Sequence, residues 1–257
     1  MRWLILCLLF LGSCAESAPS AAVASPCREQ AFESSRFTVC NADGGEILLF
    51  AAGRSERPLR SFAEVALRVD PNRVAFAMNA GMFDEDGRPI GLAAAVGVEA
   101  HKVNLRDGPG NFHMKPNGVF LVNAGGKPAI YPSDSIPMIG AAPRLMTQSG
   151  PMLVMGGKLH PAFERDGTSR LIRNGVGVTA SGRAVFVISG GPVSFGKFAR
   201  LFRDSLHTPN ALFFDGSVSS LWDPANGRQD SLSPLGPIIV VLKPAGSKPG
   251  RAGRARS

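Results

Sequence analysis

The sequence predicts a single α+β domain, in which a mixed and mostly antiparallel β-sheet is covered by a few packed helices. Short apolar runs of strand length recur along the chain, separated by glycine, proline, asparagine and serine. Two stretches carry the signals of a helix. With 257 residues the chain can bury a large core as one domain, which we place at residues 37–242.

The chain begins with the features of an export signal. Met1 and Arg2 precede the apolar run 3–11, which is too short to span a bilayer and has the length of a signal-peptide core. Residues 11–14, Leu-Gly-Ser-Cys, resemble the lipobox of bacterial lipoproteins. This resemblance implies that Cys14 becomes the acylated first residue after cleavage and anchors the protein to a membrane.

Ordinary signal cleavage near Ala15 or Ala24, each preceded by small residues, is the alternative. The stretch 15–26 is rich in alanine, serine and proline and favours the lipoprotein, because it would make a good tether. We therefore expect a signal peptide at 1–14 and a tether with the N-terminal segment at 15–36. The mature protein is expected to be periplasmic or anchored as a lipoprotein.

Export also determines what the cysteines can do. Cys7 lies in the signal, and Cys14 is removed or lipidated, which leaves Cys27 and Cys40 in an oxidising compartment. We expect these two to form a disulfide bond that pins the mature N-terminus to the first strand and contributes on the order of 3 kcal/mol. Two cysteines without nearby histidines make a zinc site improbable.

The formal charge of +8 comes largely from the C-terminal tail, residues 243–257, which has several basic residues and no acid. This tail is rich in proline, glycine, alanine and arginine, so we predict that it is disordered and could touch anionic lipid or glycan. The remainder of the chain shows no basic face interleaved with aromatic residues. Nucleic acid is therefore not expected as a partner.

The predicted strands are short and buried. They are placed at residues 37–40, 46–51, 73–79, 119–122, 152–155, 171–179, 184–189, 211–214 and 235–242. Asn-Ala-Asp-Gly-Gly at 41–45 predicts a hairpin between the first two strands, and Ser-Gly at 181–182 predicts another.

Two helices are predicted between these strands. Ser61 and Glu64 have the spacing of a capping box, which predicts a helix at 62–69 that packs against the strand at 73–79. The second helix covers 194–206, with Ser194 as its cap. Its apolar stripe consists of Phe195, Phe198, Ala199, Phe202 and Leu206. We assign this stripe to core packing.

Two of the strands end in a polar residue and a glycine turn. Asp215 and Gly216 follow the apolar run 211–214, and Asn79 ends a strand shortly before Gly81. Strand ends of this kind could meet at one cleft, where Ser219 would add a small hydroxyl group. The alternative for both is an ordinary turn in which the aspartate or asparagine stabilises its own backbone.

Other polar residues have an equally plain alternative. Lys115 could hold a phosphate or belong to an exposed edge. Arg173 sits among apolar residues and could grip a phosphate through two hydrogen bonds, or form a structural ion pair. Gln148 could orient a hydroxyl or serve as a hydrogen-bond partner within a sheet. The acidic stretch 84–87 lacks the remaining ligands of a calcium loop, which favours a solvated turn.

Five motifs stand in a fixed order along the chain. They are NAGMFD at 79–84, KPNGVF at 115–120, QSGPMLV at 148–154, RNGVGV at 173–178 and LFFDGSVSSLW at 212–222. In order and spacing they resemble the motifs of the phosphodiester glycosidase family, over about residues 37–242. Ser217 stands where the family pattern has a glycine, and Asn174 where it has a threonine.

The resemblance implies hydrolysis of the glycosidic bond in a sugar phosphodiester, which releases free sugar and a phosphate monoester. The partner would be a sugar phosphodiester or an envelope glycan, and neither a cofactor nor a metal is expected. A phosphate monoester is already a good leaving group. Catalysis would therefore depend on stabilising the oxocarbenium-like centre and the departing charge.

The resemblance also implies site residues. They are, for catalysis, Asp215, Arg173 and Asn79, and, for substrate binding, Lys115, Asn117, Gln148, Gly150, Gly216 and Ser219. Arg173 and Lys115 would hold the phosphate, and Asp215 would act as a base or stabilise charge. A second carboxylate, if one is used, would be Glu164 or Asp84.

Two other functions fit the same motifs. A non-catalytic envelope lipoprotein could bind sugar phosphates without turnover, and the departure at Ser217 leaves that alternative open. A metal-dependent phosphodiesterase would cut the other ester bond and release a sugar phosphate. The scattered positions of the four histidines argue against it. The oligomeric state does not follow from the sequence.

Overall fold

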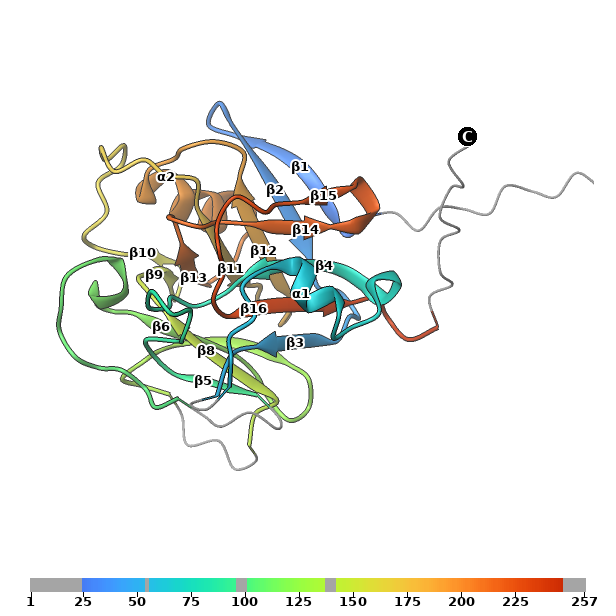
Figure 1. Ribbon diagram of the computed structural model, residues 1–257. Coiled ribbons are helices and arrows are strands. Elements are labelled where there is room, and N and C mark those ends of the chain that lie inside the picture. Colours follow the sequence, from blue (N-terminus) through green and yellow to red (C-terminus); the bar gives the residue numbers. More distant parts are fainter. Residues whose placement is uncertain (1–24, 54–55, 96–100, 137–141, 247–257) are drawn as a thin grey trace, which may run out of the picture.

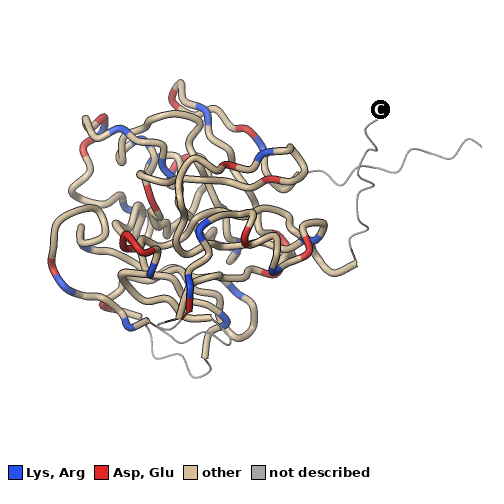
Figure 2. The backbone as a smooth tube through the Cα atoms, in the orientation of Figure 1, with Lys and Arg blue, Asp and Glu red and all other residues tan. Residues whose placement is uncertain are grey.

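The structure, a computed structural model, describes residues 25–53, 56–95, 101–136 and 142–246. The signal peptide, the lipobox cysteine and residues 247–257 of the basic tail lie outside these ranges, so what we expect of them stays a prediction. Within the described ranges no helix combines the length and the apolar character of a membrane span. Lys and Arg are interspersed with Asp and Glu over the backbone (Figure 2).

The described residues form three sheets (Figure 1). The largest has the strand order β1-β2-β12-β11-β13-β9-β10. Its strands are β1 (Cys27–Phe32), β2 (Ser35–Asn41), β9 (Met152–Met155), β10 (Lys158–Leu159), β11 (Asn174–Val178), β12 (Ala184–Ser189) and β13 (Asn210–Asp215). The strands at 152–155 and 184–189 are as predicted.

The second sheet has five strands in the order β15-β14-β4-β16-β3. They are β3 (Ile47–Phe50), β4 (Val74–Asn79), β14 (Leu221–Asp223), β15 (Arg228–Gln229) and β16 (Ile238–Leu242). The third sheet has four strands in the order β5-β8-β6-β7. They are β5 (Ala93–Ala95), β6 (Gly118–Val122), β7 (Pro128–Pro132) and β8 (Leu145–Ser149).

All strand pairs among the described residues are antiparallel. The predicted α+β class with mostly antiparallel strands is therefore confirmed, and the parallel pairs of a mixed sheet are not found in this part of the chain. The main apolar core lies between the three sheets. A single folding unit stays a prediction.

The hairpin predicted at 41–45 is wrong. Strand β2 pairs with β1 and β12, whereas β3 pairs with β16 in a different sheet. The turn residues therefore carry the chain from one sheet to another. The strand β1 was not predicted, and it forms a hairpin with β2 through Glu33 and Ser34, whose φ angles are 44° and 60°.

Two α-helices cover the outer faces of the larger sheets. Helix α1 (Phe62–Ala66) packs its apolar face on β4, β14 and β16, and the Ser61 hydroxyl accepts the Glu64 amide as predicted. Helix α2 (Phe195–Arg200) continues as a π-helical turn (Leu201–Ser205) and packs on the seven-stranded sheet. Three short 3-10 turns complete the helices of the described residues: Pro71–Arg73, Asn111–His113 and Pro224–Asn226.

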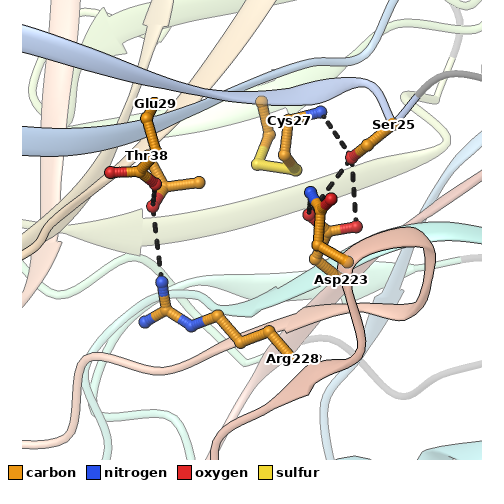
Figure 3. The surroundings of a disulfide bond; sticks show 8 residues. Ser25, Cys27, Glu29, Thr38, Asp223 and Arg228 are labelled. Carbon is orange, nitrogen blue, oxygen red and sulfur yellow. Dashed lines mark hydrogen bonds between the residues drawn. A yellow bond between two sulfur atoms is a disulfide. The ribbon is translucent and has the colours of Figure 1, made fainter.

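The predicted disulfide bond between Cys27 and Cys40 is present (Figure 3). The two residues face each other across the antiparallel pair of β1 and β2. Next to them, the Ser25 hydroxyl accepts the Cys27 amide and lies 3.1 Å from both carboxylate oxygens of Asp223. The disulfide and this contact fasten the N-terminal strand to the seven-stranded and five-stranded sheets.

Replacing Cys27 and Cys40 with serine should destabilise the fold. The bond closes a loop of 13 residues, for which chain entropy gives on the order of 3 kcal/mol. For a domain of this size that free energy corresponds to a fall in Tm of about 6 to 12 °C. Thermal unfolding of the oxidised, reduced and serine forms measures it. Equal Tm values for oxidised and reduced protein would show that the hairpin is held without the bond.

Candidate functional site

The loop 216–220 lies where the chain crosses from the seven-stranded to the five-stranded sheet. It leaves the end of β13 and enters β14, which pairs with β4. The end of β4 is Asn79, whose side chain is fully buried at this crossing. Its Oδ1 accepts the Ser220 amide at 2.9 Å. Two strand ends predicted to meet at one cleft are thus brought together.

Asn174 completes the contact between the sheets. Its Nδ2 donates to Oδ1 of Asn79 at 2.9 Å and to the Asn79 carbonyl at 2.8 Å. The Ser219 hydroxyl lies 3.0 Å from the Asp215 carbonyl, 2.9 Å from the Ile172 carbonyl and 3.3 Å from Oδ1 of Asn174. We call Asn79, Asn174, Asp215 and Ser219 the strand-end cluster.

Asp215 is the acid of this cluster and is 8% exposed. Burial raises the pKa of its carboxyl group, because the charged form is desolvated. The backbone amides of Ser217, Val218 and Gly216 oppose that rise, and Oδ1 accepts the first two as hydrogen bonds. Asp215 forms no ion pair within the described ranges. Among the described residues, backbone amides are therefore the groups that stabilise its charge.

Arg173 is completely buried beside the cluster. Its Nε donates to the Val193 carbonyl at 2.9 Å, and its Nη2 donates to the Ser169 carbonyl and hydroxyl at 3.0 and 3.1 Å. The guanidinium carbon is 3.6 Å from the centre of the Phe195 ring. No described acidic residue pairs with Arg173, so the alternative of a structural ion pair is not supported. Desolvation lowers its pKa to about 10.

Two hydrogen-bond donors in this region have no partner among the described residues: Nη1 of Arg173 and Nδ2 of Asn79. The third such buried atom is Nη1 of Arg60. A buried donor left without an acceptor costs about 1 to 3 kcal/mol, more if it is charged. We therefore expect each of these donors to form a hydrogen bond with an oxygen atom of water or of a ligand.

Lys115, Asn117 and Gly150 lie together on a different segment. The Lys115 ammonium, 43% exposed, contacts Asp107 at 2.6 Å and the Leu105 carbonyl at 2.7 Å. The Asn117 amide donates to the Phe112 carbonyl at 2.9 Å. A side chain at Gly150 would collide with Asn117. Asn117 and Gly150 thus shape the turn next to Lys115, and the polar contacts of Lys115 and Asn117 among the described residues lie outside the strand-end cluster.

Gln148 is buried, and four protein groups use its amide. Its Oε1 accepts the backbone amides of Leu92 and Asn104, and its Nε2 donates to the Asn104 carbonyl and the Ser133 hydroxyl. The structure therefore gives Gln148 the role of tying loops together. A substrate contact at this position stays a prediction, and it would require one of these bonds to break.

The two candidates for a second carboxylate are both exposed. Asp84 accepts the Arg88 amide within its own turn, as the solvated-turn interpretation expects. Glu164 lies in the loop that passes over α2, where its carbonyl is close to Gly196. The structure shows no hydrogen bond from either carboxylate to the strand-end cluster.

Sequence reasoning gave no role in the site to Asn174, Ser169 or Phe195. In the sequence, Asn174 was noted only because it stands where the family pattern has a threonine. Phe195 was correctly placed in the core stripe, but its contact with Arg173 depends on how α2 sits on the sheet. Ser169 belongs to an irregular loop without a sequence signal.

Neither a large hollow nor a metal cluster identifies the site. A hollow of about 1040 Å³ runs along β3, and none of the predicted site residues lines it. In the part of the chain that the structure describes, no three His, Cys, Asp or Glu side chains are gathered as a metal site. The strand-end cluster is singled out instead by its buried polar groups and unused donors.

Comparison with known proteins identifies the family of this chain. A family model described as phosphodiester glycosidase matches residues 72–241, a range that contains all five motifs. The uncharacterized protein YigE of Escherichia coli (strain K12) is 37% identical over 160 residues, which are 61% of this chain and 62% of that protein. The chain thus matches less than two thirds of the length of this relative.

A solved structure shares the fold. The zebrafish N-acetylglucosamine-1-phosphodiester alpha-N-acetylglucosaminidase catalytic domain, auto-inhibited by its pro-peptide, aligns with a TM-score of 0.55. The alignment covers 84% of this chain and 81% of that one at 13% sequence identity. At this identity the likeness concerns the arrangement of the backbone.

Proposed function

Because the chain belongs to the phosphodiester glycosidase family, we propose that it hydrolyses the glycosidic bond of a sugar phosphodiester. Water adds to the anomeric carbon, the bond between that carbon and the phosphate oxygen breaks, and the products are free sugar and a phosphate monoester. The nature of the sugar and of the group on the other side of the phosphate is part of the proposal's test.

One observation carries this proposal: Arg173 is a buried cation for which the described part of the chain supplies no counter-ion. Its guanidinium is held by neutral carbonyls, a hydroxyl and a ring, and Nη1 is unused within the described residues. Burying a charge is costly unless an opposite charge joins it. A phosphate group supplies that charge and matches the geometry of a guanidinium.

The strand-end cluster supports the remaining steps. The Asp215 carboxylate would stabilise the positive charge that develops at the anomeric carbon, or would take a proton from the attacking water. Nδ2 of Asn79, which has no acceptor among the described residues, would donate to a sugar hydroxyl. Arg173 would stabilise the departing phosphate. These groups are fixed by the two sheets before substrate binds.

The test is hydrolysis of an N-acetylglucosamine phosphodiester in water enriched in oxygen-18. The proposed reaction releases free sugar and leaves the phosphate monoester without label, because the carbon–oxygen bond is cut. A phosphodiesterase would place the label on phosphorus. Binding without turnover would identify the non-catalytic alternative. Mass spectrometry of the products distinguishes the three outcomes.

The rate should depend on the ionisation of Asp215. Burial raises the pKa of this carboxyl group above its ordinary value, and the proposed role needs the charged form. As the pH falls through that raised pKa the carboxylate is protonated, so kcat/KM should decline at a higher pH than an ordinary carboxyl group, with a pKa of about 4, would give. A pH profile whose acid limb lies at or below that value would contradict this role.

The proposed setting is the cell envelope, with a sugar phosphodiester or an envelope glycan as the partner. The Cys27–Cys40 disulfide supports an oxidising compartment. Release of the protein from membranes by detergent but not by salt would support acylation at Cys14, and a freely soluble mature protein would contradict it.

A further inference from the structure

Arg173 stands at one end of a stack of flat side chains. Its guanidinium lies 3.6 Å from the centre of the Phe195 ring. The Phe195 ring stacks on Phe163 with centres 4.9 Å apart and an angle of 10° between the planes. Phe163 in turn stacks on His160 at 4.7 Å and 26°. His160 Nε2 is 3.0 Å from the Lys115 carbonyl. The stack therefore joins the segments of both residues assigned to the phosphate.

We propose that Phe195 is a positioning residue for Arg173, and that Phe163 and His160 hold the Phe195 ring in place. The ring face fixes the guanidinium in the orientation that leaves Nη1 for a phosphate oxygen. This inference rests on the proposed function, since it concerns how the same site holds its anion.

The chemistry of the partners supports this role. A carboxylate would also hold a guanidinium firmly, but it would cancel the charge that a phosphate needs. An aromatic face attracts the cation and leaves its net charge in place. Arg200, in contrast, is bound by Glu33 through two hydrogen bonds of 2.8 and 2.6 Å. Of the two buried arginines in the described ranges, Arg200 is thus paired with a carboxylate and Arg173 is not.

The Phe195 ring is itself tightly constrained. Phe195 is the first residue of α2 and is 9% exposed. Its ring also meets Phe213 edge to face at 4.8 Å, and Phe213 precedes Asp215 by two residues on β13. The guanidinium carbon lies 5.3 Å from the Phe213 ring centre. The position of Arg173 is therefore coupled to the strand that carries Asp215.

The far end of the stack is fixed by a neutral imidazole. Nδ1 of His160 accepts the Ala162 amide at 3.2 Å, so the proton lies on Nε2 and is donated to the Lys115 carbonyl. Burial lowers the pKa of His160, which keeps the ring uncharged. No positive charge from this residue therefore competes with Arg173 for an anion.

The test compares phosphate binding by F195L and wild type, with glycerol 3-phosphate as the probe in titration calorimetry. Losing the ring face of a desolvated cation–π contact should weaken binding about tenfold to thirtyfold. F195Y keeps the ring and should bind within about threefold of wild type. F198L is the matched control, because Phe198 is buried on the same helix and contacts Phe37 and Phe202. It should lower Tm and leave the affinity unchanged.

A spectroscopic measurement tests the stack without any ligand. The Nε proton of Arg173 should show an upfield ring-current shift in the NMR spectrum of wild type and F198L, and this shift should be lost in F195L. R173K identifies the signal by its absence. If F195L does not fold, F163L replaces it. Phe163 is partly exposed, so its substitution should disturb the fold less, and F163L removes the ring that stacks on Phe195.

The outcomes separate this inference from the proposed function. If F195L binds glycerol 3-phosphate as tightly as wild type, Phe195 does not position Arg173. If wild type binds no phosphate ester and hydrolyses none, the proposed function is wrong. In that case the chemical shift of the Arg173 Nε proton alone tests the role of Phe195. A wild-type signal at an ordinary chemical shift would overturn the stacked arrangement.

Discussion

Replacing Asp215 with asparagine should lower kcat by at least about 100-fold, the usual range for losing a group that transfers a proton or stabilises charge. Asparagine has the same shape and keeps an acceptor oxygen for the amides of Ser217 and Val218. Only the charge is removed. Because burial already disfavours that charge, the substitution should change Tm by no more than a few degrees. Steady-state kinetics and thermal unfolding measure the two effects.

The matched control for this prediction is D223N. Asp223 is 1% exposed, lies on the next strand and accepts hydrogen bonds from Ser25 and Asn226. The same substitution there removes a buried carboxylate outside the strand-end cluster, so turnover should persist. Undiminished turnover by D215N would exclude Asp215 as the catalytic carboxylate.

The strand ends of the site could be predicted from sequence because their signals are local. An apolar run followed by a polar residue and a glycine marks the end of a buried strand wherever that strand pairs. Asn79 and Asp215 stand at such strand ends, Ser219 follows in the loop after Asp215, and the structure brings the three together. Their meeting depends on β14 pairing with β4, and the sequence did not predict β14.

Pairing between distant segments limits what sequence can predict about the fold. The turn residues at 41–45 suit a connection between two sheets as well as a hairpin. The outcome depends on the distant strands β12 and β16, which pair with β2 and β3 in two different sheets. The same limit applies to side chains. Gln148 is used up by Asn104 and Ser133, which are 44 and 15 residues away. Whether a polar residue has a partner is a property of the whole fold.

Arg173 has no acidic partner among the described residues, a property that likewise depends on the whole fold, and this leads to the second large effect. Arg173→Met should lower kcat/KM about 100-fold, because charge-assisted hydrogen bonds to a phosphate are lost. At saturation, about 100 times Kd, glycerol 3-phosphate should stabilise wild type by about 2.7 kcal/mol. That free energy raises Tm by about 5 to 10 °C for a domain of this size. R173M should show no such rise.

Arg200→Met provides the comparison that separates binding from folding. Arg200 is 6% exposed and paired with Glu33, so its loss leaves an unpaired carboxylate and should lower the Tm of the free protein. R173M removes a buried charge that has no acidic partner among the described residues, so it leaves no described carboxylate unpaired and its free Tm should change less. The response to glycerol 3-phosphate should have the opposite order: R200M should keep the ligand-induced rise in Tm, and R173M should lose it.

This crossed pattern is what distinguishes a ligand-binding arginine from a structural one. If Arg173 served only the fold, R173M would unfold at lower temperature than R200M, and both would respond to glycerol 3-phosphate in proportion to the protein that remains folded. R173K then separates charge from geometry. Its ammonium keeps the positive charge but cannot make two parallel hydrogen bonds to one phosphate, so an intermediate rise in Tm is expected. A full rise in R173M would place the phosphate elsewhere in the protein.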